Sequence, residues 1–405
     1  MIISKPELIS QSGNLQYRVH VHYSGKSETL WFSLSEEFAD LVSDRSDAPL
    51  VALLIPAMLQ GEDIHIEGTI SEKLFYNISG PYQKVLKLII PSLHLINIIP
   101  SDVQPAHQIG EGVAMGFSGG IDSFCVLADH HYADVPEGFK ITHLLFNNVG
   151  SHGPDENGSR RLFQKRYARM KPTTERIELP FIAIDSNMDL FYHGLDFQLT
   201  HTPRNASIAL LLQRGFKRFL YASAYHYSNS FVGPSNDMAY SDTVTLPLLS
   251  TEALDMISSG SQYTRVEKTL KVARIEESYR SLDVCVEEDT QMMNCSSCFK
   301  CKRTMLTLEI AGELERYADV FDLNTYRKIR DLYIEEVLHS KDPLLQEIAS
   351  FIRINGFKLP LFSRLYVRTR LFIIVNQVKH VAKIPFRIAR KIKRKYLKTS
   401  LNTIF

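Results

Sequence analysis

Residues 113–123 read VAMGFSGGIDS, and this stretch decides the fold. Its apolar start predicts a buried parallel strand, and the apolar residues that follow it predict the first turns of a packed helix. Two adjacent glycines let the backbone approach a ligand without an intervening Cβ, and a helix N-terminus offers free N–H groups to an anion. Asp122 supplies a hard oxygen ligand suited to Mg²⁺. The residues predicted to bind pyrophosphate in this loop are Ser118, Gly119, Gly120, Asp122 and Ser123.

The string SGGIDS at 118–123 resembles the SGGxDS signature of the PP-loop ATP pyrophosphatases. It differs from the Walker loop, because no Gly-Lys-Ser/Thr follows the glycines. The resemblance implies that ATP is cut between its α and β phosphates, that AMP is attached to a substrate oxygen, and that pyrophosphate is released. It therefore implies ATP and Mg²⁺ as ligands. The alternative is an ordinary glycine-rich turn between a strand and a helix.

A second feature is the clustering of cysteines, since four of the five fall within 17 positions. A CxxCxxC motif places three thiolates on a tight turn, and a fourth can return from the preceding segment. Four thiolates suit a structural Zn²⁺, and the motif also suits an iron–sulfur cluster. Chance clustering of buried cysteines is the remaining alternative, because a disulfide framework is not expected without an evident signal peptide. The predicted metal ligands are Cys285, Cys295, Cys298 and Cys301.

The loop and the cysteines together resemble the 7-cyano-7-deazaguanine synthase family, PP-loop enzymes that convert a deazaguanine carboxylate into a nitrile. In that family four cysteines at nearly this spacing hold a structural zinc. The resemblance covers roughly residues 110–312 and includes Pro-Arg-Asn at 203–205, which looks like the family's Gly-Arg-Asn near the nucleotide. It therefore implies a role for Arg204. The family's Asp-Tyr-Gly-Gln is replaced by Asn-Asn-Val-Gly at 147–150, so the resemblance indicates a reaction type and leaves the substrate open.

A segment between the predicted sheet and the cysteines supplies two candidate cations. PP-loop enzymes often carry a lysine here that approaches the phosphates, and we assign this role to Lys268 rather than to Lys271. Arg265 is a second candidate, because cleavage of ATP builds negative charge that a fixed cation stabilises. A solvated helix face is the alternative for both cations. Asp242 is a weaker candidate for a second carboxylate near Mg²⁺.

Composition limits the remaining possibilities. The chain has 405 residues, of which 44% are apolar, so two or three domains with a full core are expected. No apolar run approaches the ~18 residues needed to span a bilayer, and clustered cysteines suit a reducing cytoplasm. Residues 356–405 contain 13 Lys or Arg and no Asp or Glu. Interleaved apolar residues predict an amphipathic helix in this tail, which would contact an anionic membrane surface, RNA or the acidic body of the protein.

Strand and helix signals divide the chain into three parts. In residues 1–108, side chains alternate between apolar and polar from Leu15 to Tyr23, which predicts a half-buried strand in an α+β accessory domain. Residues 109–320 alternate strands and helices, which predicts an α/β fold with a doubly wound parallel sheet and ligands at the carboxyl ends of its strands. Residues 321–405 are expected to be helical and to end in the basic tail. The strands predicted for the parallel sheet are 113–117, 141–146, 177–184 and 219–222.

These features together predict an ATP-dependent, ligase-like enzyme with Asp122, Arg204 and Lys268 as catalytic residues. A substrate oxygen, expected to be a carboxylate, attacks the α-phosphate, and ammonia or an amine then displaces AMP from the acyl-adenylate. The expected acceptor is a small molecule or a modified nucleobase, and a homodimer remains open. Two alternatives also remain: a tRNA thiolation enzyme of the PP-loop class, and a catalytically silent nucleotide-binding scaffold.

Overall fold

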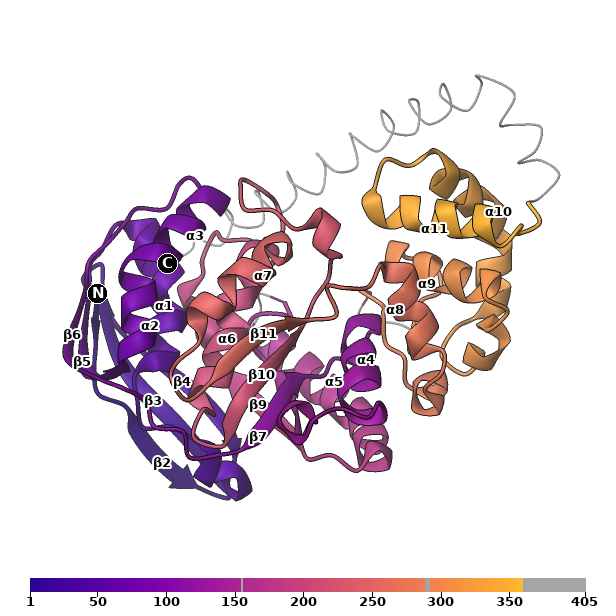
Figure 1. Cartoon of the computed structure of the whole chain (residues 1–405). Coiled ribbons are helices and arrows are strands. Elements are labelled where there is room, and N and C mark those ends of the chain that lie inside the picture. Colours follow the sequence, from indigo (N-terminus) through magenta and orange to yellow (C-terminus); the bar gives the residue numbers. More distant parts are fainter. Residues whose placement is uncertain (154–155, 288–291, 360–405) are drawn as a thin grey trace, which may run out of the picture.

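The structure, a computed structural model, describes residues 1–153, 156–287 and 292–359, and its α/β fold is built on an 11-stranded mixed sheet (Figure 1). The strand order is β11-β10-β7-β8-β9-β4-β3-β1-β5-β6, and β2 pairs with β3. The α/β class predicted from the sequence is therefore confirmed. The strands are β1 (Ile2–Ile3), β2 (Glu7–Gln11), β3 (Asn14–Tyr23), β4 (Lys26–Ser35), β5 (Ile64–Ser71), β6 (Ile98–Gln104), β7 (Gly112–Gly116), β8 (His143–Asn147), β9 (Phe181–Ser186), β10 (Phe216–Ala222) and β11 (Asp255–Ser259).

Five parallel strands, β11, β10, β7, β8 and β9, form the half of the sheet that carries the candidate loop. Parallel strands are usually covered on both faces and therefore read as apolar runs. In β7, for example, Val113, Ala114 and Met115 are fully buried. Helices α4 (Ile121–Leu127), α5 (Glu156–Ile177) and α6 (His201–Leu211) lie between successive strands of the chain. This alternation brings the carboxyl ends of the parallel strands to one edge, where ligands bind in folds of this kind.

The N-terminal strands continue the same sheet. β4 pairs antiparallel with β9 through Phe32 and Ser186, so strands on both sides of the predicted domain boundary at residue 108 belong to one sheet. The alternating strand predicted between Leu15 and Tyr23 is β3, whose Leu15, Tyr17, Val19 and Val21 are buried. The N-terminal half of the sheet combines parallel and antiparallel pairs. β1, β5 and β6 are parallel neighbours, whereas β3 is antiparallel to both β1 and β4.

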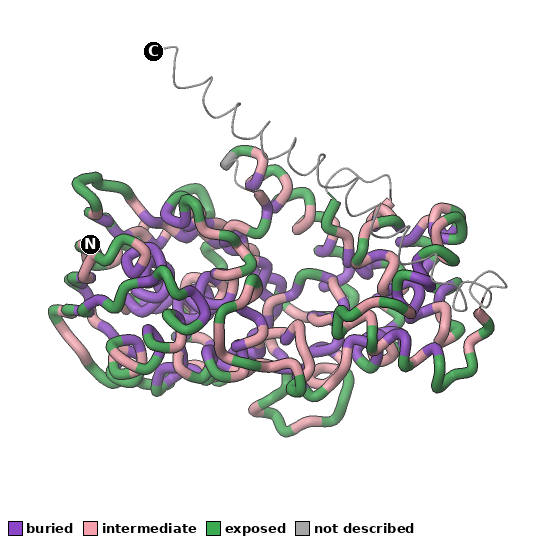
Figure 2. Tube along the Cα trace, turned by 90° about the horizontal axis from the view of Figure 1, so that it is seen from above, coloured by how far each residue is buried: buried purple, intermediate pink, exposed green. Residues whose placement is uncertain are grey.

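Helix α1 (Asp47–Gln60) connects the two halves through a shared core. Its residues from Asp47 to Met58 are all buried, and the helix packs against α6 and β5. A helix that is apolar on all sides is expected in the interior of a protein. Figure 2 shows buried residues running through both halves. The carboxylate of Asp47 is satisfied there by the Ser71 backbone N–H at 2.8 Å and the Gln213 amide at 2.7 Å.

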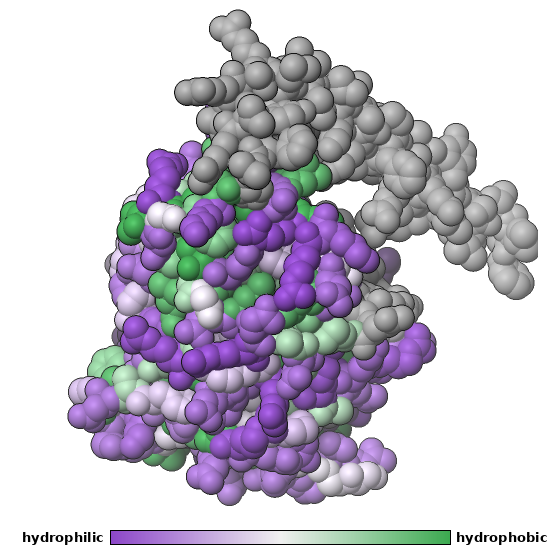
Figure 3. All heavy atoms as spheres, turned by 90° about the vertical axis from the view of Figure 1, so that its right-hand side faces the viewer, coloured by the Kyte–Doolittle hydropathy of each residue, from purple (hydrophilic) through white to green (hydrophobic). Residues whose placement is uncertain are grey.

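The C-terminal helices lie at the end of the molecule opposite the N-terminal strands (Figure 1). Figure 3 shows this end, where an apolar area lies among hydrophilic residues; exposed apolar side chains of the C-terminal helices include Phe299, Leu332 and Ile354. The basic tail predicted for residues 356–405 lies outside the described residues from residue 360 onward. Within the described part, no helix is both long and apolar enough to cross a bilayer. The remaining helices are α2 (Glu72–Asn77), α3 (Gln83–Ile89), α7 (Asp242–Thr245), α8 (Arg265–Val272), α9 (Phe299–Ile310), α10 (Leu323–His339) and α11 (Pro343–Ile354).

The strand boundaries differ from the sequence-based prediction by up to four residues, and the largest difference lies at the start of β9. The third strand was expected to begin at Ile177, but Ile177 is the last residue of α5 and β9 begins at Phe181. Glu178 ends the helix with a φ of 62°, a left-handed conformation typical of helix termini. The short apolar run around Ile177 therefore belongs to the packed end of a helix. Periodicity alone cannot distinguish such a run from a buried strand.

Candidate functional site

A cavity of about 440 Å³ opens at the carboxyl edge of the parallel strands. Gly116, Asn147 and Ala222 line it at the ends of β7, β8 and β10, so it lies where the topology predicts a ligand. Helices α5, α6, α8 and α9 contribute the other walls through Arg166, His201, Arg265 and Lys300, among other residues. Of the residues predicted to bind nucleotide or metal, those that line the cavity are Ser118, Gly120, Asp122, Ser123, Arg265 and Cys285.

The glycine-rich loop has the geometry that its composition requires. Gly119 adopts a φ of +76°, which disfavours residues with a side chain, and a Cβ there would lie 2.5 Å from the sulfur of Met170. The carbonyl of Gly119 accepts a hydrogen bond from the Asp283 backbone N–H at 2.8 Å. The Ser123 hydroxyl donates to the Gly120 carbonyl at 3.0 Å, which fixes the turn into α4. The loop is therefore anchored from both sides.

Asp122 forms the electrostatic centre of the loop. Arg265 Nη2 lies 2.8 Å from its Oδ2, and Lys268 Nζ lies 3.1 Å from its Oδ1. Burial alone would raise the pKa of Asp122, but Arg265 and Lys268 outweigh burial and hold this pKa below its ordinary value. The Lys268 side chain is 1% exposed and also donates to the Ser223 carbonyl. Lys271 instead pairs with Asp129 at 2.6 Å, outside the cavity lining.

Two further cations, Lys300 and Arg303 on α9, line the same cavity. Among the described residues, neither makes an ion pair with a carboxylate, and the Arg303 Nε has no hydrogen-bond partner. Burial, followed by the charge of Arg265, lowers the pKa of Arg303 to about 10. Burial likewise lowers the pKa of Lys300. The cavity therefore holds an excess of positive charge, which an anion would neutralise.

The four clustered cysteines come together beside this cavity. The Sγ atoms of Cys285, Cys295, Cys298 and Cys301 all lie within 4.8 Å of one another, an arrangement that could hold a metal ion such as zinc. The Sγ atoms of Cys298 and Cys301 lie 3.4 Å apart. The hydrogen-bonded contact with Cys301 lowers the pKa of Cys298, which favours a thiolate at this position. The donor set fits Zn²⁺, which binds thiolates and lowers their pKa.

Helix α9 links the cysteines to the cavity. It begins at Phe299 after Cys298, and Cys301 lies in its first turn. Lys300 and Arg303 are three residues apart on the same helix, so they share a face. The cysteine cluster therefore anchors the start of the helix that presents both cations. These two residues were not predicted from the sequence. Lys300 lies inside the CxxCxxC motif and Arg303 two residues after it, so their spacing of three residues was the available signal.

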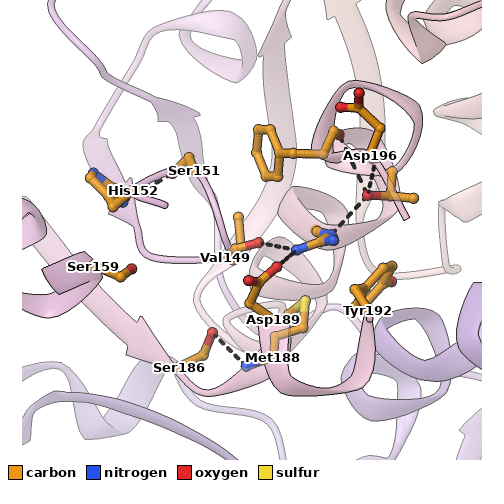
Figure 4. Close-up of polar contacts among 12 residues, drawn as sticks. Val149, Ser151, His152, Ser159, Ser186, Met188, Asp189, Tyr192 and Asp196 are labelled. Carbon is orange, nitrogen blue, oxygen red and sulfur yellow. Dashed lines mark hydrogen bonds and ion pairs between the residues drawn. The ribbon is translucent and has the colours of Figure 1, made fainter. Parts of the chain in front are cut away.

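Arg204 does not line the cavity, unlike its neighbour Asn205. Its side chain is fully buried, donates to the Val149 carbonyl at 2.9 Å and pairs with Asp189 at 2.6 Å. Its guanidinium carbon lies 3.7 Å from the ring centre of Tyr192, and Figure 4 shows Val149, Asp189 and Tyr192 around this group. The structure therefore brings Asp122, Lys268 and Arg265 together but keeps Arg204 in the interior.

The other wall of the cavity is formed by neutral polar and aromatic groups. Asn147 donates to Asn205 at 3.1 Å, and the buried Oδ1 of Asn147 has no hydrogen-bond partner among the residues that the structure describes. His201 and Tyr221 line the same wall. Asp242 lies behind it, accepts a hydrogen bond from Thr202 at 2.6 Å and does not line the cavity. This wall is suited to a ligand that is planar or offers hydrogen-bond donors.

Comparison with known proteins does not identify relatives. No protein-family model matches the chain, and no significant match was found among curated proteins or among solved structures. Functional conclusions about this chain therefore depend on the geometry of its own cavity.

Proposed function

We propose that this protein is an ATP-dependent adenylating enzyme whose cavity binds the polyphosphate of ATP at the glycine-rich loop. The observation that carries the proposal is the surplus of partly buried cations, Lys300 and Arg303, next to the loop that holds Asp122. Cations drawn partly out of water without a counterion among the described residues are costly, so their presence favours a polyanionic ligand. The resemblance of residues 118–123 to the PP-loop signature supports the same conclusion.

Each part of the cavity has a role in this proposal. The loop backbone and the cations of α8 and α9 bind the leaving pyrophosphate, whose charge grows as the bond between the α and β phosphates breaks. The substrate oxygen attacks the α-phosphorus, and the resulting acyl-adenylate reacts with ammonia or an amine. Asn147 and Asn205 orient the organic parts of the ligands, so that much of the acceleration comes from positioning and electrostatics.

Asp122 links the cations to the loop. Both of its carboxylate oxygens contact cations, so it holds Arg265 and Lys268 in place beside the phosphate site. A carboxylate at this position also fits Mg²⁺, which would neutralise phosphate charge when bound with the nucleotide. Arg265 and Lys268 would then turn toward the phosphates themselves.

Product analysis tests the proposal directly. The protein is incubated with Mg-ATP, ammonia and a panel of carboxylates that includes deazapurine and sugar acids, and products are analysed by mass spectrometry. For at least one acceptor we expect AMP, pyrophosphate and an amide in equal amounts, or two AMP and two pyrophosphate per nitrile, because dehydration of the amide requires a second adenylation. Release of ADP and phosphate instead of AMP and pyrophosphate would contradict the proposal. ATP binding with no turnover for any acceptor would favour the silent scaffold.

Cys285 favours one second candidate, a tRNA thiolation enzyme. Its thiol belongs to the metal cluster and also lines the cavity, where it could deliver sulfur to an activated base. Zinc bound to all four cysteines would oppose this candidate, because a closed tetrahedral site leaves no thiolate free. Iron in the purified protein, seen as a brown colour, would favour it.

A further inference from the structure

Three polar side chains from separate segments form a hydrogen-bonded chain at the cavity wall. The Tyr221 hydroxyl, at the end of β10, lies 2.6 Å from Nδ1 of His201, the first residue of α6. Nε2 of the same imidazole lies 3.3 Å from Oδ1 of Asp237. The planes of the Tyr221 and His201 rings differ by only 4°. With its proton on Nε2, His201 accepts a hydrogen bond from the phenol and donates one to the carboxylate.

Asp237, at one end of this hydrogen-bonded chain, is held in place by its own hydrogen bonds. Asp237 accepts a hydrogen bond from the Ala239 backbone N–H at 2.9 Å and one from the Tyr225 hydroxyl at 3.1 Å. Burial would raise the pKa of Asp237, but the hydrogen bonds from His201 and Ala239 outweigh it and lower this pKa. Asp237 is therefore ionised and is oriented to stabilise a positive charge on the imidazole, as in other carboxylate–histidine pairs.

Tyr221, at the other end of the hydrogen-bonded chain, faces the cavity. Tyr221 and His201 both line the cavity, whereas Asp237 does not. Because Leu220 pairs with Met115, Tyr221 lies opposite Gly116, just before the glycine-rich loop. Burial, and then the charge of Asp242, raise the pKa of Tyr221 well above its ordinary value. The phenol is therefore neutral at rest, and its proton leaves only when His201 receives it.

We propose that Tyr221, His201 and Asp237 form a proton relay in which the Tyr221 oxygen takes the proton of the attacking nucleophile. The proposal rests on the proposed adenylation, because it concerns the second half of that reaction. The amine nitrogen forms a bond to the acyl carbon, and the bond from that carbon to the AMP oxygen breaks with its electron pair on AMP. The N–H proton passes to Tyr221 while the phenolic proton passes to Nδ1 of His201. Asp237 stabilises the imidazolium, which later releases the proton to water.

A purely structural tie between α6 and β10 is the competing explanation for these contacts. The two differ in one chemical property, because only a relay makes the Tyr221 oxygen unusually nucleophilic. Tyr76 and Tyr227 are exposed, with 73% and 54% of their surface accessible, and do not line the cavity, so they provide internal references for ordinary phenols. His226 is a matched control for His201, since it bonds Ser228 on the surface and does not line the cavity.

Labelling with methanesulfonyl fluoride tests the relay without nucleotide or acceptor. The whole protein is treated with this small electrophile, and the modification rate of each tyrosine is measured by peptide mass spectrometry. We expect Tyr221 to react at least about tenfold faster than Tyr76 and Tyr227, as base assistance requires. In the H201Q variant the Tyr221 rate should fall to the reference level, and in H226Q it should not change.

Two outcomes would overturn the relay. One is a labelling rate of Tyr221, in the protein without substitutions, that is no higher than the rate of the reference tyrosines. The other is a high labelling rate of Tyr221 that persists in H201Q. A separate arm with Mg-ATP distinguishes this result from the proposed function. If ATP fails to slow labelling of a reactive Tyr221, nucleotide binding in this cavity is contradicted, whereas the transfer of the Tyr221 proton to His201 is still supported.

Discussion

Arg204 in the interior and Arg303 at the cavity have the same side chain but differ in how many partners their guanidinium groups have. Arg204 is fully buried and has a carbonyl, a carboxylate and an aromatic ring as partners. Arg303 lines the cavity and keeps a buried Nε without a partner. Since buried polar groups are normally satisfied, the unsatisfied arginine is the one available to a ligand. A motif can therefore select an arginine that the fold buries among internal partners, while an arginine outside that motif lines the cavity.

The largest effect is expected for the cysteine cluster that anchors the cavity cations. C298S should lose zinc and lower the free energy of unfolding by several kcal/mol, because metal binding is coupled to local folding. Elemental analysis and denaturant melts measure both effects. C125S is the control, since Cys125 is a buried cysteine outside the cluster and should keep the metal. Full zinc content in the C298S protein would show that Cys298 is not required for metal binding. It would contradict a four-cysteine site that anchors the cavity cations.

Asp122 tests the cavity side of the comparison. D122N removes the shared counterion of Arg265 and Lys268, and it should slow substrate-dependent pyrophosphate release by ~10²–10³. Because two buried cations lose their carboxylate, it should also lower the melting temperature, while the protein remains folded at the assay temperature. D129N serves as a control, because Asp129 pairs with Lys271 away from the cavity lining. Near-normal pyrophosphate release in a folded D122N protein would remove the loop from the mechanism.

Arg204 tests the interior side. R204M leaves Asp189 and the Val149 carbonyl without their donor, and should lower the free energy of unfolding by about 2–3 kcal/mol. R303M should change it by less than about 1 kcal/mol, because no carboxylate loses a partner. Urea denaturation of both variants measures the difference. Equal destabilisation by the two substitutions would mean that the distinction between the two arginines has no energetic basis.

Asp242 is an exception in the interior, because its buried Oδ2 has no hydrogen-bond partner within the described part of the chain. Burial raises the pKa of Asp242 to about 6 in the folded protein, above its ordinary value near 3.8. The folded state therefore keeps this proton up to a higher pH than the unfolded state does. The contribution of Asp242 to the free energy of unfolding is full below about pH 4 and declines as the pH rises to about 6. D242N should remove this decline and be more stable at pH 7, by on the order of 2 kcal/mol.

Unfolding free energies measured between pH 4 and pH 7 check the role of Asp242. D134N provides a control with the same charge change at an exposed position. An unaltered pH dependence in D242N would show that another group titrates in this range.

The sequence was most informative where one segment carries the whole signal. Residues 113–123 predicted the strand, the loop and the helix, because apolar runs and paired glycines act locally. β11 was not predicted, since Asp255–Ser259 is short and polar for a strand and is fixed by pairing with β10. The relay could not be predicted either, because Tyr221, His201 and Asp237 meet only through the tertiary fold. The basic tail from residue 360 lies outside the described residues, and its membrane contact remains a prediction.

Calorimetric titration with ATP, inorganic tripolyphosphate and adenosine tests the central claim most directly. ATP and tripolyphosphate should bind, and K300M and R303M should each weaken both by about tenfold, because each removes a charge-assisted contact. K302M should leave affinity unchanged, since Lys302 pairs with Glu336 at 3.1 Å and does not line the cavity. Adenosine should bind much more weakly than ATP. Absence of saturable binding by ATP and tripolyphosphate, or equal affinity in R303M and the unmodified protein, would contradict a polyphosphate site in this cavity.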